Sequence, residues 1–141
     1  MAENGILNLS EKENSVLFPS LLFVNTNLDI FVKKFFDYLL RTEVVVLFEK
    51  TNMEELEKKF QSSFKIILYN FQHPINLNDH MKLLISKHLE SGIMPEHIDK
   101  FYDCFMKTIN DMLVESFNEH VIKIWQKLIL QLLAYFRKKL Y

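Results

Sequence analysis

Apolar side chains recur at intervals of three and four residues through segment 28–40. This is the period of an α-helix, so the spacing predicts a helix with one buried face. The rest of the chain favours helices too. Its 141 residues include two glycines and three prolines, too few for a β-sandwich or barrel, which needs a turn about every 8–12 residues. The sequence therefore predicts an all-α fold. The periodic positions are Leu28, Phe31, Val32, Phe35, Phe36, Leu39 and Leu40.

Capping residues divide the chain into six predicted helices. Ser10, followed three residues later by Glu13, forms the pattern of a capping box and opens the first helix. Asn52 is a suitable cap for the third helix, and Asn76 or Asn78 for the fourth. We expect residues 1–9 to be an N-terminal lead segment that precedes the fold, and residues 10–141 to form a single domain. The predicted helices are 10–23, 28–40, 53–71, 76–90, 95–115 and 118–140.

Two segments depart from regular helix in this prediction. Pro19 lies inside the first helix and predicts a kink or a restart there, because proline lacks the N–H that a helix interior uses. Segment 44–48 has the composition of a strand. A lone strand has no partner for its backbone groups, so we expect a short irregular turn instead.

Charge and cysteine content exclude several classes of protein. The formal net charge is −1, which gives no electrostatic reason to expect a nucleic acid partner. Cys104 is the single cysteine and cannot form an internal disulfide, which favours a reducing compartment such as the cytoplasm. The longest apolar run is about five residues, against about 20 for a span of a bilayer. We therefore expect no membrane association, and no secretory signal opens the sequence.

His88 lies in the last turn of a predicted helix, and a turn containing Gly92 and then Pro95 follows it. This segment resembles the proximal corner of the globin family. The likeness continues along the chain, because several further segments resemble features of that family in the same order. Counted in the helices of that family, these segments are 9–13 (its first helix), Phe35-Phe36 with Leu39 (its second helix), Leu47-Phe48 (the turn after its third helix) and Trp125 (its last helix).

The resemblance implies a three-over-three globin-like sandwich of helices that holds haem b. His88 would bind the iron through a ring nitrogen, and Phe48 would pack on the porphyrin. No Cys-x-x-Cys-His occurs, so the haem would be held non-covalently. From residue type alone, His88 is also an ordinary helix-end histidine that the helix dipole favours. The full set of implied cofactor-binding residues is Phe36, Phe48, Leu56, Lys59, Phe60, Ser63, Leu84, His88, Ile93, Ile98 and Phe101.

The implied distal side departs from the usual pattern. Phe36 stands where many bacterial globins have a tyrosine that donates to bound oxygen, and Tyr38 is the alternative donor. One register of segment 53–71 puts Lys59 and Ser63 at the distal positions, and a longer spacing puts Leu56 and Phe60 there. The first register is preferred, since the second places a glutamate where a small residue is usual. Neither supplies the usual distal histidine or glutamine, so bound oxygen would be stabilised poorly.

The leading function is therefore reversible binding of a diatomic gas, oxygen or nitric oxide, for sensing, scavenging or storage. A haem-free globin-fold sensor or interaction module is the alternative. Nitric oxide detoxification with a separate reductase is weaker, because Ile98 stands where flavohaemoglobins place a tyrosine near the histidine. Enzyme activity is thus disfavoured. Oxygen binding and catalysis both depend on the haem that His88 would hold.

The last predicted helix is apolar around most of its circumference, with a narrow polar stripe. Such a helix is buried on more than one side. It is either the central helix of the core or part of an interface. Sensor globins pair through their last two helices, so we expect a homodimer through segments 98–115 and 121–140. The polar stripe consists of Lys123, Lys127, Gln131 and Lys138.

Overall fold

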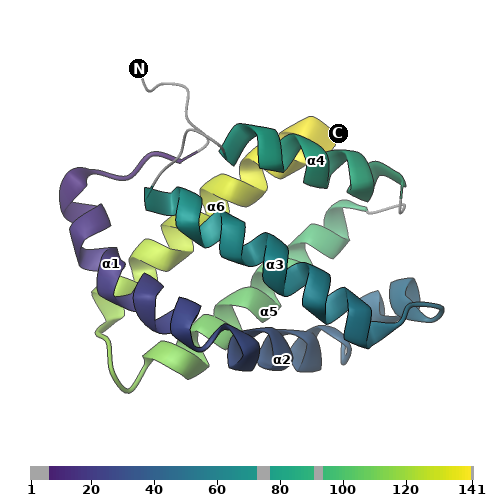
Figure 1. Cartoon of the computed structure of the whole chain (residues 1–141), viewed down its shortest axis with the longest axis horizontal. Coiled ribbons are helices and arrows are strands. Elements are labelled where there is room, and N and C mark those ends of the chain that lie inside the picture. Colours follow the sequence, from purple (N-terminus) through teal and green to yellow (C-terminus); the bar gives the residue numbers. More distant parts are fainter. Residues whose placement is uncertain (1–6, 73–76, 91–93, 141) are drawn as a thin grey trace.

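A computed structural model of the chain describes residues 7–72, 77–90 and 94–140. These residues form six α-helices and one 3-10 helix, and none of them lies in a strand. The predicted all-α fold is confirmed (Figure 1). The elements are α1 (Glu11–Thr26), α2 (Leu28–Leu39), η2 (Glu43–Phe48), α3 (Met53–Gln72), α4 (Leu77–Glu90), α5 (Pro95–Leu113) and α6 (Glu119–Leu140).

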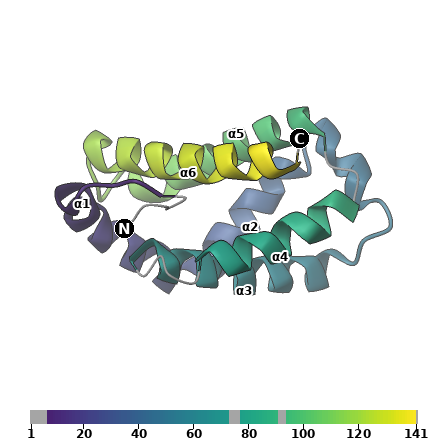
Figure 2. The same ribbon diagram turned by 90° about the horizontal axis from the view of Figure 1, so that it is seen from above.

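The helices form two layers around one apolar core. Seen from above, α5 and α6 run along one side and α3 and α4 along the other, with α1 at one end (Figure 2). α2 crosses between the layers and packs on both α5 and α3. α4 packs against α3 on one flank and against α6 on the other. This arrangement places the last turn of α4, which carries His88, beside the core helices.

Side-chain caps fix where several helices begin, and two follow the sequence prediction. Ser10 and Glu13 form the expected capping box: the Glu13 N–H donates to Ser10 Oγ at 3.0 Å, and the Ser10 N–H to Glu13 Oε1 at 2.9 Å. Asn52 Oδ1 accepts from the Glu55 N–H at 3.2 Å. At the start of α6, Asn118 Oδ1 accepts from the Val121 N–H at 3.1 Å. Each cap satisfies a backbone donor that the first helical turn leaves without a partner. The proposed cap at Asn76 lies outside the described residues.

The expected restart at Pro19 is wrong. α1 runs without a break from Glu11 to Thr26, with Pro19 inside it. Pro19 lies on the exposed side of α1, so water can solvate the carbonyl that loses its helical partner. Segment 44–48 is not a strand, as expected, but it is regular. It belongs to the 3-10 helix η2, whose first turn is capped by Thr42 Oγ1 accepting from the Val44 N–H at 3.2 Å.

Aromatic side chains fill the centre of the molecule. Trp125, Phe31, Phe35 and Phe105 are among the largest side chains that are fully buried. Each buries about 150–250 Å², so this cluster supplies a large part of the hydrophobic stabilisation. Cys104 is buried beside it, and burial raises the pKa of its thiol. At this position Cys104 packs as a small hydrophobic residue.

A buried hydrogen bond joins the first and last helices. The indole N–H of Trp125 donates to Ser20 Oγ at 2.8 Å, and the Ser20 hydroxyl donates to the Leu17 carbonyl at 2.7 Å. Both side chains are inaccessible to solvent. The chain of two bonds satisfies the polar atoms of Trp125 and Ser20 inside an apolar interior, where an unpaired group is costly.

α6 packs against α1, α4 and α5 within the same chain. Its apolar circumference therefore has partners on several sides, which is the arrangement of a central core helix. The Leu130 side chain of α6 is exposed. The homodimer through segments 98–115 and 121–140 stays a prediction.

In the part of the chain that the structure describes, no single helix has the length and hydropathy of a membrane span. Glu11–Thr26 and Leu28–Leu39 pass the same criteria only as a pair, and they are bent by 84° at their junction.

Candidate functional site

His88 lies in the last turn of α4, and a hydrogen bond fixes its imidazole. Its Nδ1 is 2.7 Å from the carbonyl oxygen of Leu84, one turn earlier. A carbonyl oxygen only accepts hydrogen bonds, so Nδ1 carries the proton and donates. In the neutral ring the lone pair is then on Nε2, which is the form that binds a metal ion. The tautomer required for ligation is thus set by α4 itself.

Phe136, from α6, packs its ring against the His88 imidazole. The two ring centroids are 5.0 Å apart, and the planes meet at 86°, an edge-to-face contact. Phe136 is buried, so it limits the rotation of the imidazole from the side of α6. The helical period of segment 118–140 predicts an apolar side chain at Phe136. It cannot predict the contact with His88, 48 residues earlier, because that pairing depends on how α4 crosses α6.

Four of the predicted cofactor-binding residues form one cluster of rings. Phe36 of α2 lies 5.2 Å from Phe60 of α3 and 6.4 Å from Phe48 of η2, measured between ring centroids. Phe60 lies 6.3 Å from Phe101 of α5. Phe36 is buried, whereas Phe48, Phe60 and Phe101 retain some exposure. The structure thus brings these four side chains together, with part of their apolar surface left uncovered.

The remaining apolar candidates fall into three groups. Leu56 and Leu84 are half-buried on α3 and α4. Ile98 is buried in the first turns of α5. Ile93 lies outside the described residues. Nearby, at the start of α5, the Met94 N–H donates to His97 Nδ1 at 2.9 Å, so His97 caps a helix, a role that the sequence did not reveal.

The two preferred distal residues, Lys59 and Ser63, have different surroundings. Lys59 is exposed on α3. Ser63 Oγ lies 2.8 Å from His80 Nε2 on α4, so this pair joins the two helices. Burial lowers the pKa of His80, which favours the neutral imidazole. The Ser63–His80 contact was not foreseen, since no local pattern pairs residues from two different helices.

Tyr38, the alternative oxygen-stabilising donor, has a different partner. Its hydroxyl donates to Asp111 Oδ2 on α5, and the Lys107 ammonium lies 5.7 Å from the centre of its ring. The hydrogen bond to the Asp111 carboxylate raises the pKa of Tyr38. This hydroxyl is therefore engaged at α5.

Two surface grooves lie away from these residues. One, of about 390 Å³, is lined by residues of α2 and α3, and another, of about 340 Å³, by residues of α1 and α3. None of the predicted cofactor-binding residues lines either groove. Among the described residues, no three His, Cys, Asp or Glu side chains converge to hold a metal ion. His88 is therefore a candidate single protein ligand, which suits a metal whose other positions a cofactor occupies.

The sequence model of the globin family, described simply as Globin, matches residues 32–136. This chain belongs to the globin family. The match covers more than half of the chain and includes all of the predicted site residues, from Phe36 to Phe101, and the ring of Phe136 at its end. No curated protein matches this globin closely enough for a comparison.

Globins typically bind haem, and the residues of this globin fit that group in two respects. The Nδ1–H of His88 donates to Leu84, so Nε2 is the nitrogen suited to bind iron. The partial exposure of Phe48, Phe60 and Phe101 leaves aromatic surface for a flat apolar macrocycle. Both features are present in the protein without a bound cofactor.

Proposed function

We propose that this globin holds haem b non-covalently through His88 and binds a diatomic gas, oxygen or nitric oxide, reversibly. The observation that carries this proposal is the 2.7 Å hydrogen bond from His88 Nδ1 to the Leu84 carbonyl. Bound haem would supply an iron centre that takes up the gas at a coordination position not used by the protein. Sensing, scavenging and storage all require this binding step. The buried, unpaired Cys104 suits a reducing compartment such as the cytoplasm.

The residues of the chain would have separate tasks. His88 is held in one tautomer by Leu84 and is packed by Phe136, and these two contacts set the orientation of its ring. Phe48, Phe60 and Phe101 offer partly exposed rings that would cover the macrocycle and exclude water. Exclusion of water protects a bound gas from displacement and the iron from oxidation.

The distal side would retain oxygen weakly. Lys59 is exposed, and a lysine of this kind keeps its charged end in water. Ser63 is hydrogen-bonded to His80, so its hydroxyl has a partner within the protein. In the preferred register, neither side chain is therefore poised to donate to bound oxygen. Fast release of oxygen favours sensing or transfer over long-term storage.

Titration of the purified protein with haemin tests the proposal. We expect an intense Soret band that saturates at one haemin per chain. His88→Ala should shift or abolish that band, because the iron loses its protein ligand. His120→Ala is the matched control, since His120 is exposed at the start of α6, and it should leave the titration unchanged. Equal spectra for the wild type and His88→Ala would contradict the proposal.

A haem-free interaction module is the second candidate, and one observation favours it. Phe60 stacks on Phe35 with centroids 5.1 Å apart and planes at 15°, and Phe35 also meets Phe101 at 4.9 Å. These rings already pack against one another without a cofactor. For this candidate, the same titration would leave the protein colourless and its unfolding temperature unchanged by haemin.

We also propose a homodimer through segments 98–115 and 121–140, as in sensor globins. The support is the Leu130 side chain of α6, which is exposed. Sedimentation at micromolar concentration tests it. A dimer that Leu130→Asp dissociates would support the proposal, and a monomer at that concentration would contradict it.

A further inference from the structure

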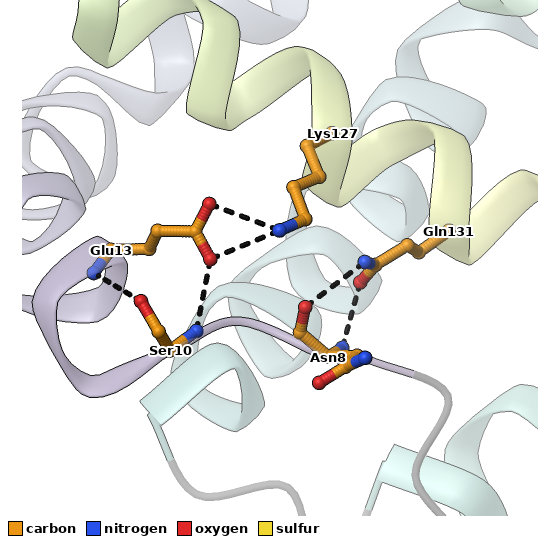
Figure 3. Close-up of polar contacts among 5 residues, drawn as sticks. All are labelled: Asn8, Ser10, Glu13, Lys127 and Gln131. Atoms are coloured by element: carbon orange, nitrogen blue, oxygen red, sulfur yellow. Dashed lines mark hydrogen bonds and ion pairs between the residues drawn. The ribbon is translucent and has the colours of Figure 1, made fainter.

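The segment that precedes α1 is attached to the middle of α6. We call residues 7–10 the N-terminal strap. The Asn8 N–H donates to Gln131 Oε1 at 2.8 Å, and Gln131 Nε2 donates to the Asn8 carbonyl at 3.1 Å. Figure 3 shows both bonds between the Gln131 amide and the main chain of Asn8. The glutamine side chain thus pairs with the strap as a neighbouring strand would, and the Asn8 side chain takes no part in these bonds.

A second contact lies one turn earlier on α6. The Lys127 ammonium lies 3.0 Å from both carboxylate oxygens of Glu13, and Glu13 Oε1 also accepts from the Ser10 N–H at 2.9 Å (Figure 3). The Ser10 backbone and Lys127 lower the pKa of Glu13. Leu7 and Leu9 are half-buried against the core. The strap is thus held by both polar and apolar contacts.

α6 carries this attachment toward His88. Phe136 lies five residues after Gln131, which is about 7.5 Å along a helix axis, and its ring meets the His88 imidazole at 5.0 Å. The first half of α6 is fixed to α1 through Trp125 and Ser20. Near its end, Arg137 pairs with Asp99 on the exposed surface, where such a pair contributes little. Between Trp125 and Phe136, α6 is also held by the buried side chains of Leu128, Ile129 and Leu132, and the strap adds an exposed polar attachment at Gln131.

We propose that the N-terminal strap positions His88 through α6. Its attachment at Gln131 fixes the rotation of α6 and so the edge-to-face contact of Phe136 with the imidazole. Phe136 is then a positioning residue, and the strap supports it. Where it concerns iron binding, this inference rests on the proposed function. The strap would control the position of the His88 nitrogen that would bind haem iron. A factor that displaces the strap would loosen the proximal ligand from outside the site.

Gln131→Ala tests the strap directly, because it removes both bonds to Asn8. Asn8→Ala is the matched control, since it leaves the main chain that makes those bonds. In the haem-free protein, we expect Gln131→Ala to shift the imidazole carbon resonances of His88 in the NMR spectrum and Asn8→Ala to leave them in place. In the protein loaded with haemin, we expect Gln131→Ala to speed transfer of haemin to excess apomyoglobin about fivefold, and Asn8→Ala to leave the rate unchanged.

A second pair of variants tests Phe136 as the link. Phe136→Leu removes the aromatic ring, and Phe136→Tyr keeps it. Phe71→Leu is the control, because Phe71 is also buried and contacts Trp125 with centroids 6.4 Å apart. Both leucine variants should lower stability, but only Phe136→Leu should shift the His88 resonances and speed haemin loss. Phe136→Tyr should leave the His88 resonances and the rate of haemin loss as they are in the wild type.

Unchanged His88 resonances in folded Gln131→Ala would overturn the inference, as would equal effects of Gln131→Ala and Asn8→Ala. A wild-type protein that takes up no haemin would contradict the proposed function but not this inference, since the NMR comparison is made without haem. The two failures are therefore distinguishable.

Discussion

The Nδ1–H of His88 donates to the carbonyl oxygen of Leu84 across one turn of α4, at 2.7 Å. This bond makes the imidazole a single tautomer and keeps Nε2 as the nitrogen with a lone pair. The bond therefore prepares a metal ligand within α4.

Stability should fall as the pH falls through the ordinary pKa of histidine, because of His80. Burial lowers the pKa of His80 below its usual 6.5 in the folded protein. The unfolded chain therefore binds the proton more readily, and protonation favours unfolding. This contribution is present above pH 6.5 and is lost as the pH falls through 6.5 toward the lowered pKa of the folded state. Urea unfolding at a series of pH values measures it.

His80→Asn isolates that effect, since asparagine is polar but does not titrate. Its stability should change less between pH 7 and pH 5 than that of the wild type, and His120→Asn, at an exposed position, should behave as the wild type. Loss of the Glu13 contribution lies at lower pH, because the pKa of Glu13 is lowered from 4.5 in the folded protein and the loss is centred below that ordinary value. A pH dependence unaltered by His80→Asn would refute the assignment.

Ser20→Ala should destabilise the protein by about 1–3 kcal/mol, the cost of an unsatisfied buried group. The substitution leaves the Trp125 indole N–H without its acceptor in a fully buried site. Ser15→Ala, on the exposed side of α1, should change stability by less than about 0.5 kcal/mol. Chemical denaturation of both variants measures the difference. Equal stabilities would mean that the Trp125–Ser20 bond contributes nothing.

A glutamine placed at the true distal position should slow oxygen release about three- to tenfold, the effect of one hydrogen bond. If the preferred register is right, Lys59→Gln will do this and Leu56→Gln will not. Stopped-flow measurement of oxygen dissociation from the ferrous protein separates the two registers. Slowing by Leu56→Gln alone would show that Leu56 and Phe60 face the gas.

Local patterns predicted most of the helices but few of the contacts between them. The spacing of Phe31 and Phe35 and the capping box of Ser10 act within a few residues, so α2 and the start of α1 could be located from the sequence. Pro19 gave a wrong expectation, since its cost depends on which side of α1 faces solvent. Exposure is set by the tertiary packing.

In the candidate site, too, local patterns predicted individual residues but not the contacts between helices. His88 could be chosen from its place at a helix end and from the family resemblance, and the match to residues 32–136 supports the resemblance. Its contact with Phe136, and the bond between Ser63 and His80, join different helices. Such pairs depend on crossing angles and register. The spacing of apolar residues within each helix does not indicate which residues of two helices will meet.

The most direct test of the central claim is the absorbance spectrum of the reduced, haemin-reconstituted protein before and after addition of carbon monoxide. The wild type should give a Soret band that sharpens and shifts with the gas, and the gas-free spectrum should show an iron held by one imidazole. His88→Ala should lose the imidazole-bound spectrum, and free imidazole in the buffer should restore it. A wild type without a Soret band, or a gas-free spectrum identical in His88→Ala, would contradict the assignment of His88 as the haem ligand.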